Sequence, residues 1–203
     1  MNPEALAHLC ASDKILARLI KKVGPCKLKP KRRPPFEALV SAVTHQQLNG
    51  TAARTILNRV IALYPGKRFP TPEDLLATSD ERLRGAGLSR AKTAALKDLA
   101  DKTLSGLVPA SRAVSKMSDA ELVERLTVVR GVGPWTVEML LMFTLGRPDV
   151  LPVADYGVRK GFAVTYGLVD LPTPKELLAH GERWRPHRTT AAWYLWRALE
   201  LPE

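Results

Sequence analysis

Apolar residues recur along almost the whole chain with the period of an α-helix. They stand three and four residues apart, and no stretch shows convincing two-residue alternation typical of a strand. Start signals such as Thr71-Pro72 and the capping-box pattern that begins at Ser118 mark where helices begin. The pattern predicts helices over residues 3–11, 13–22 (capped by Ser12), 36–45, 50–63, 90–104, 119–130, 134–145, 155–165, 173–184 and 186–200. The fold is therefore expected to be all-α.

A tight turn between two of these helices contains Gly131, Val132 and Gly133. Glycines allow the backbone to bend sharply and to approach a ligand closely, and Pro134 suits the first position of the next helix. A helix N-terminus presents unpaired backbone N–H groups and the positive end of the helix dipole. We therefore expect an anion site at this turn, with Thr136 as a further donor.

Basic residues outnumber acidic residues by 31 to 20, so the formal net charge is +11. This excess is typical of proteins that bind polyanions, although a basic protein with well-solvated lysines has the same composition. Together with an anion site, it favours nucleic-acid phosphate as the ligand. Arg159 and Lys160 are candidate contacts to a DNA backbone, or else part of a solvated helix face.

The remaining composition narrows the class of protein. No run approaches the roughly 18 apolar residues of a membrane span, and the N-terminus does not resemble a signal peptide, so we expect a cytoplasmic protein with no membrane partner. Two cysteines are too few for a disulfide framework or a four-cysteine iron–sulfur cluster. The four histidines are scattered, so we expect neither a catalytic metal nor a cofactor.

Four segments of the chain resemble the helix-hairpin-helix (HhH-GPD) superfamily of DNA glycosylases, and within it the 3-methyladenine DNA glycosylase II family. The first is the Gly131–Gly133 turn, which is similar to the family's hairpin. The others are the segment around Thr44-His-Gln-Gln-Leu-Asn, the segment Leu151-Pro-Val-Ala-Asp155, and residues 182–196. They occur in the family's order and spacing, so the resemblance covers roughly residues 36–200.

The resemblance implies a two-lobed fold in which two helical subdomains flank a cleft. A single glycosylase domain would span residues 1–203, with one lobe at about 36–115 and the other at 1–35 plus 116–203. The helix-hairpin-helix itself would occupy about 119–145. Larger members of the family carry an additional N-terminal β-rich domain, and this sequence resembles a compact form without it.

Asp155 matches the catalytic aspartate of the family. Cleavage of an N-glycosidic bond passes through a cation-like sugar, which a fixed carboxylate at C1′ stabilises. The same carboxylate can orient or deprotonate the attacking water. The alternative role is a helix N-cap, because Asp155 precedes a predicted helix, and the two roles are compatible.

Tryptophans stand at informative places in the matched segments. In lyase-type members of the superfamily a lysine stands two positions after the second hairpin glycine, where this chain has Trp135, which cannot form a Schiff base. The resemblance therefore implies an enzyme without lyase activity. Trp135 and Trp196 are expected to stack on a flipped cationic base, and Trp193, one helical turn before Trp196, to share its face. The alternative for these tryptophans is core packing.

Gln47, Leu48 and Asn49 lie between two predicted helices. The resemblance implies that this turn enters the minor groove, with Leu48 filling the space left by the flipped nucleotide and Asn49 bonding to neighbouring base edges. The alternative for Leu48 is ordinary core packing. In this family the hairpin carbonyls can also hold a monovalent cation.

The resemblance thus implies a monomeric, monofunctional glycosylase that excises alkylated purines from double-stranded DNA in base-excision repair, at the nucleoid. Bases such as 3-methyladenine and 7-methylguanine carry positive charge and leave readily, so charge stabilisation by Asp155 suffices with little general-acid help. Two alternatives stay open. One is a helix-hairpin-helix glycosylase for another lesion, such as uracil or an oxidised purine, and the other is a non-catalytic module that binds lesions.

Overall fold

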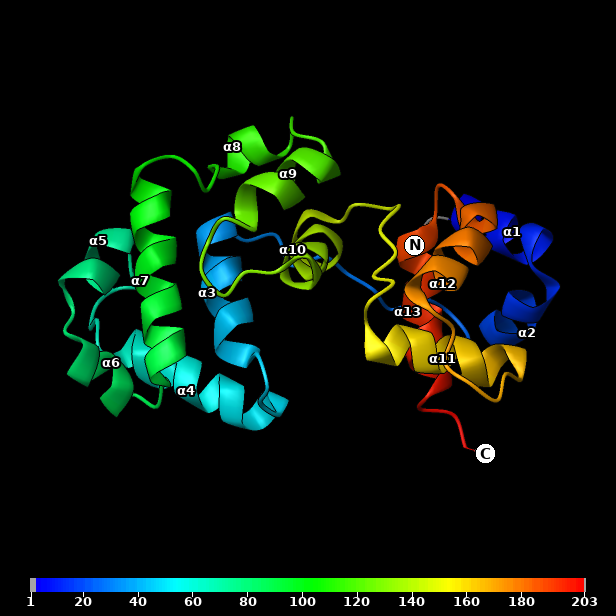
Figure 1. Cartoon of the computed structure of the whole chain (residues 1–203), viewed down its shortest axis with the longest axis horizontal. Coiled ribbons are helices and arrows are strands. Elements are labelled where there is room, and N and C mark those ends of the chain that lie inside the picture. The colour runs from blue at the N-terminus through cyan, green and yellow to red at the C-terminus, as the bar shows by residue number, and fades with distance from the viewer. Residues whose placement is uncertain (1–2, 203) are drawn as a thin grey trace. The chain divides into compact units, whose positions relative to one another are not determined.

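The computed structural model describes residues 3–202 of the chain. These residues form helices joined by turns and loops and contain no β-strand, which confirms the all-α prediction. They divide into two compact units (Figure 1). Unit 1 combines the chain up to Pro30 with the chain from Leu141 onward, and unit 2 is Lys31–Leu140.

The division differs from the expected lobes by five residues at its first boundary, which lies at 30/31 rather than 35/36, and more at its second boundary, which lies at 140/141 rather than 115/116. The reason is packing, because α10 (Pro134–Leu140) lies against α9 (Asp119–Leu126) and α3 (Pro35–His45). The hairpin therefore belongs to unit 2, together with the turn that carries Leu48.

Unit 2 is built around its longest helix, α7 (Arg90–Leu104). Leu96 and Leu99 are fully buried, and α7 packs against α3 and against the shorter helices near it, as Figure 1 shows. The other helices of the unit are α4 (Gly50–Ala62), α5 (Pro72–Ala77), α6 (Asp80–Gly85) and α8 (Ser111–Val114). The central helix thus supports both the α3–α4 turn and the hairpin.

Unit 1 is built around α13 (Arg188–Ala198), which packs against α2 (Lys14–Val23) and α11 (Tyr156–Tyr166). Most of α13 is buried, including Tyr194 and Leu195. The remaining elements are α1 (Pro3–Ser12), a π-helical turn (Leu141–Leu145), α12 (Pro174–Gly181) and a 3₁₀ turn (Glu182–Trp184). None of the helices in the described range is long and apolar enough to cross a membrane.

Local start signals place several helices as the sequence predicted. Thr71 and Ser118 each cap a helix in a complete capping box, a motif whose capping side chain contributes roughly 1 kcal/mol. One predicted cap was wrong, because Asp13 rather than Ser12 caps α2. The Asp13 carboxylate accepts hydrogen bonds from the N–H groups of both Ile15 and Leu16.

Two predicted helices end earlier than expected. The helix that leads into the hairpin ends at Leu126, and the N–H of Arg130 donates to the Asp98 side chain instead of continuing the helix. The helix predicted over 134–145 is α-helical only to Leu140 and continues as the π-helical turn.

Candidate functional site

Asp155 occupies the N-terminus of α11 in unit 1. Its Oδ1 accepts a hydrogen bond from the N–H of Val158 at 2.8 Å and another from the indole N–H of Trp196 at 2.9 Å. The N-cap interpretation of Asp155 is therefore confirmed. Two donors from different helices fix the orientation of the carboxylate, and the positive end of the α11 dipole faces it.

Trp196 is partly exposed, and its ring lies 5.7 Å, centroid to centroid, from that of Phe143 on the π-helical turn. Trp193 has different surroundings, since it is only 8% exposed and its ring contacts Tyr194 and the guanidinium of Arg197. These are the contacts of a core residue. The structure thus brings Trp196 to Asp155 and places Trp193 in the packing of unit 1, so that a pocket role for Trp193 gains no support.

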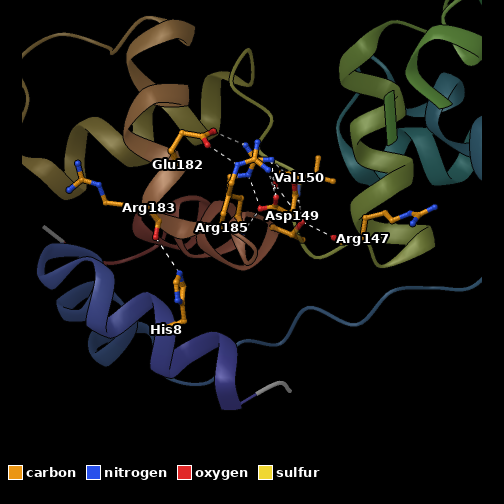
Figure 2. A network of polar contacts seen from close by, with 9 residues as sticks. His8, Arg147, Asp149, Val150, Glu182, Arg183 and Arg185 are labelled. Carbon is orange, nitrogen blue, oxygen red and sulfur yellow. Dashed lines mark hydrogen bonds and ion pairs between the residues drawn. The ribbon is translucent and has the colours of Figure 1, made fainter. Parts of the chain in front are cut away.

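The segment before Asp155 is tied to the start of α13 by the polar network of Figure 2. Asp149 accepts from Nε of Arg188 at 2.7 Å and from Nη1 of Arg185 at 2.7 Å. The Thr189 hydroxyl donates to the carbonyl of Arg147 at 2.7 Å and accepts from the N–H of Val150 at 3.0 Å. Hydrogen bonds therefore hold the segment that leads to Asp155 against the start of α13, the helix that carries Trp196.

The hairpin of unit 2 depends on the small size of Gly131. This residue has a φ of 76°, which favours glycine, and a methyl group here would lie 3.1 Å from Cβ of Ala95. The preceding N–H, from Arg130, donates to Asp98 at 2.7 Å. Val132 is buried, and the bond from Arg130 to Asp98 holds the turn on α7.

The prediction that the Thr136 side chain donates to phosphate is not supported. Thr136 is only 2% exposed, and its hydroxyl accepts a hydrogen bond from the side-chain amide of Gln46 at 3.2 Å. Its own N–H donates to the carbonyl of Gly133. Burial therefore makes Thr136 a support of the hairpin. Phosphate binding by the backbone of Gly131, Val132 and Gly133 stays a prediction.

The turn between α3 and α4 presents Leu48 at the surface. Leu48 is 39% exposed, which excludes the alternative of ordinary core packing. Gln47 has a φ of 57°, a strained conformation for a residue other than glycine, and such strain is common at functional sites. Asn49 caps α4, because its side-chain oxygen accepts a hydrogen bond from the N–H of Ala52. Contacts of these residues with DNA stay predictions.

Lys92 of α7 supports the same turn from within unit 2. Its ammonium group donates to the carbonyls of Thr44 and Gln46 at 2.8 Å each, and burial lowers its pKa. Sequence reasoning missed Lys92, Gln46 and Asp98 as residues that hold the site. Gln46 lies inside a segment that the sequence singled out, but its partner Gly131 is distant in sequence and no local signal points to it.

Trp135 is 43% exposed in the first turn of α10, directly after the hairpin. This exposure suits a ring that stacks on a base more than it suits a core residue. Trp135 belongs to unit 2 and Trp196 to unit 1, and their sharing of one base pocket stays a prediction.

Two predicted backbone contacts lie on α11. Nε of Arg159 donates to the carbonyl of Pro172 at 2.8 Å, so part of this side chain holds the loop before α12. Lys160 is exposed. The carbonyl of Gly131 already accepts from Gln46, and cation binding by the hairpin stays a prediction. No cluster of three or more His, Cys, Asp or Glu side chains suited to a metal ion occurs among residues 3–202.

The known proteins to which this chain is similar are DNA repair proteins. Residues 40–186 match the family model of HhH-GPD superfamily base excision DNA repair proteins. The DNA-3-methyladenine glycosylase 1 of Schizosaccharomyces pombe is 41% identical to this chain over 204 residues, which cover 98% of the chain and 89% of the relative.

Solved structures agree with the sequence comparison. A structure of the Schizosaccharomyces pombe 3-methyladenine DNA glycosylase Mag1 in complex with abasic DNA is similar with a TM-score of 0.90 and 40% identity, covering 98% of this chain and 97% of that chain. The DNA-3-methyladenine glycosidase of Bacillus halodurans is similar with a TM-score of 0.86 and 37% identity, covering 97% and 89%.

Proposed function

Because the chain belongs to the HhH-GPD superfamily of base excision DNA repair proteins, we propose that it is a monofunctional DNA glycosylase that excises alkylated purines from double-stranded DNA. The observation that carries the proposal is the Asp155 carboxylate, which two donors orient at the N-terminus of α11. The relatives named as 3-methyladenine glycosylases support 3-methyladenine as a lesion. We include 7-methylguanine because it carries the same positive charge.

The DNA contacts follow from the two turns of unit 2. The backbone of the Gly131–Gly133 hairpin binds phosphate, and the net charge of +11 attracts the duplex. The exposed Leu48 side chain enters the space that the flipped nucleotide leaves and offsets part of the lost stacking. The protein works as a monomer at chromosomal DNA, which places it at the nucleoid in the cytoplasm.

Base release then needs little acid catalysis. The N-glycosidic bond breaks with its electron pair moving to the methylated base, which leaves as a neutral molecule. The cation-like sugar is stabilised by the Asp155 carboxylate, and water adds to C1′ and loses a proton to complete the hydrolysis. The electron-rich faces of the exposed Trp135 and of the partly exposed Trp196 are each a proposed stacking surface for a cationic base. The product is an intact abasic site.

The test is release of free bases from methylated duplex DNA, measured by chromatography for the wild type and for Asp155→Asn. Asparagine also caps helices well, so the variant keeps the start of α11 while it loses the negative charge. We expect Asp155→Asn to release methylated purines at least about 100-fold more slowly, which is typical for loss of one electrostatic catalytic group. Affinity for DNA with an abasic-site analogue serves as the control for folding.

Three outcomes would contradict parts of the proposal. Equal release by both proteins would remove Asp155 from the chemistry. Release of uracil or an oxidised purine in place of methylated purines would indicate a glycosylase for another lesion. Tight binding to lesion-containing DNA without any base release would indicate a non-catalytic lesion-binding module.

A further inference from the structure

Helices α11 and α13 approach each other closely where α11 carries two glycines. Gly157 and Gly161 are four residues apart and therefore lie on the same face of the helix. A methyl group at Gly161 would overlap the backbone carbonyl of Leu195 on α13. The separation of the two helices at this point is thus set by a residue without a side chain.

One helical turn earlier, Gly157 faces the pair formed by Asp155 and Trp196. A methyl group at Gly157 would lie 2.9 Å from Cδ1 and 3.0 Å from Nε1 of Trp196, and 3.1 Å from Oδ1 of Asp155. Nε1 of Trp196 and Oδ1 of Asp155 are the two atoms that share the indole–carboxylate hydrogen bond of 2.9 Å. Any side chain at Gly157 would therefore press on the donor and on the acceptor at once.

Trp196 is partly exposed, but contacts of its ring and of its helix limit how far it can shift. Its ring packs beside that of Phe143, and α13 is held to the chain before Asp155 by the bonds from Arg188 to Asp149. Packed interiors accommodate an added methyl group by shifting side chains, and here the side chains that would shift are those at the site.

We propose that Gly157 is a positioning residue for the hydrolysis. Its missing side chain lets the indole N–H of Trp196 reach Oδ1 of Asp155, and this bond fixes the carboxylate in the orientation that faces C1′ of the flipped nucleotide. The inference rests on the proposed role of Asp155. It assigns to Trp196 a second task beside base stacking, which is to hold the carboxylate.

The first measurement is single-turnover base release by Gly157→Ala. A displacement of the carboxylate by about 1 Å is expected to slow the reaction roughly 10- to 100-fold. The enzyme concentration that gives half of the maximal rate is expected to stay within about twofold of the wild type, because Gly157 is not proposed to contact DNA. Gly85→Ala is the matched control, since Gly85 is helical, has open space at its Cβ position and belongs to unit 2. It is expected to react at the wild-type rate.

The second measurement reads the hydrogen bond directly and needs no activity. The indole N–H resonance of Trp196 is assigned by its absence in Trp196→Phe. In a proton–nitrogen correlation spectrum it is expected to move in Gly157→Ala and in Asp155→Asn, and to stay in place in Gly85→Ala. A purely structural role of Gly157 would leave this resonance where it is in the folded variant.

A double variant separates positioning from general damage. If Gly157 acts through the indole bond, Gly157→Ala combined with Trp196→Phe is expected to be about as slow as Trp196→Phe alone. Independent effects that multiply would overturn the inference. An unmoved resonance and an unchanged rate in Gly157→Ala, with an active wild type, would overturn it and leave the glycosylase function standing. An inactive wild type would overturn both.

Discussion

The side-chain amide of Gln46 donates a hydrogen bond to the carbonyl oxygen of Gly131 at 2.9 Å, although 85 positions separate them in the sequence. A second bond from the same amide reaches the hydroxyl of Thr136 at 3.2 Å. Gln46 stands directly before the turn that carries Leu48, and Gly131 opens the hairpin. One side chain therefore joins the two turns that are proposed to contact DNA.

We expect Gln46→Ala to weaken DNA binding without unfolding the protein. The variant loses two neutral hydrogen bonds, together worth roughly 1–2 kcal/mol, which corresponds to a 5- to 30-fold loss if the ordering is needed for binding. The measurement is the Kd for a duplex with an abasic-site analogue. Gln46→Glu, which keeps the size but removes the donor, is expected to bind at least as weakly. Wild-type affinity in both variants, with an unchanged melting temperature, would contradict the role of Gln46.

Leu48→Ala is expected to impair base flipping more than stability, because the side chain is exposed and supports little packing. Extrusion costs a few kcal/mol from a paired site and less from a mismatched one. The rate of base release is therefore expected to fall roughly 10-fold on a paired lesion and much less on a mismatched lesion. The measurement is single-turnover release from the two duplexes.

Leu104→Ala provides the matched control for the Leu48 prediction. Leu104 is a similarly exposed leucine of the same unit, at the end of α7, and has no proposed contact with DNA. It is expected to leave both rates unchanged. An equal penalty of Leu48→Ala on paired and mismatched lesions would show that Leu48 does not act in the flipping step.

Features that depend on neighbouring residues could be predicted from the sequence. Thr71 and Ser118 cap helices, and Asp155 caps the helix that it precedes, because a short polar side chain reaches only backbone a few residues ahead. The hairpin glycines were also found in advance. At Gly131 a left-handed φ and the nearby Ala95 explain why glycine is needed.

Features that depend on the tertiary packing could not be predicted in this way. The predicted phosphate contact of Thr136 is not supported, because Thr136 is buried and its hydroxyl accepts a hydrogen bond from Gln46, which comes from a distant segment. The N–H of Arg130 donates to the carboxylate of Asp98 on α7, and this bond holds the hairpin against that helix. The role of Gly157 was not predicted at all, because only the position of α13 shows that Trp196 lies against it.

The residue at position 135 leads to a prediction about the product. Trp135 stands at the position where lyase-type members of the superfamily have a lysine. An indole, unlike the lysine amine, cannot form a Schiff base with C1′. We expect the DNA strand to stay intact after base release and to break only on treatment with alkali. Borohydride is expected to trap no covalent complex between enzyme and DNA. Strand breakage by the purified enzyme, or a trapped complex, would require another nucleophile in the chain.

Asp13 stands at the centre of a buried polar cluster in unit 1. Its Oδ2 accepts from the Tyr166 hydroxyl at 2.5 Å, from His180 at 3.0 Å and from the Trp184 indole at 3.0 Å. Burial opposes ionisation, but the N–H of Leu16 and these side-chain donors outweigh it and lower the pKa of Asp13 to about 2. Burial and the bond to Asp13 raise the pKa of Tyr166, so that its hydroxyl stays protonated and donates.

This cluster makes the stability of the protein depend on pH in a known direction. The pKa of Asp13 is lower in the folded chain than in the unfolded chain, where it is near 3.9, so the ionised carboxylate stabilises the fold above about pH 4. The stabilisation, roughly 2 kcal/mol, is lost as the pH falls from about 4 toward about 2. We expect the free energy of unfolding in urea to fall by this amount through Asp13 in that window.

The variant Asp13→Asn isolates the contribution of the carboxylate. At neutral pH it is expected to be less stable than the wild type, because an amide N–H₂ group then faces donors from Tyr166 and Trp184 in a buried position. Its free energy of unfolding is expected to change less between about pH 5 and about pH 2.5, because the titrating group is gone. Asp170→Asn, at an exposed carboxylate of the same unit, is expected to follow the wild type. Parallel pH dependences for the wild type and Asp13→Asn would show that the cluster contributes no proton-linked stability, since the depressed pKa requires the two curves to converge toward low pH.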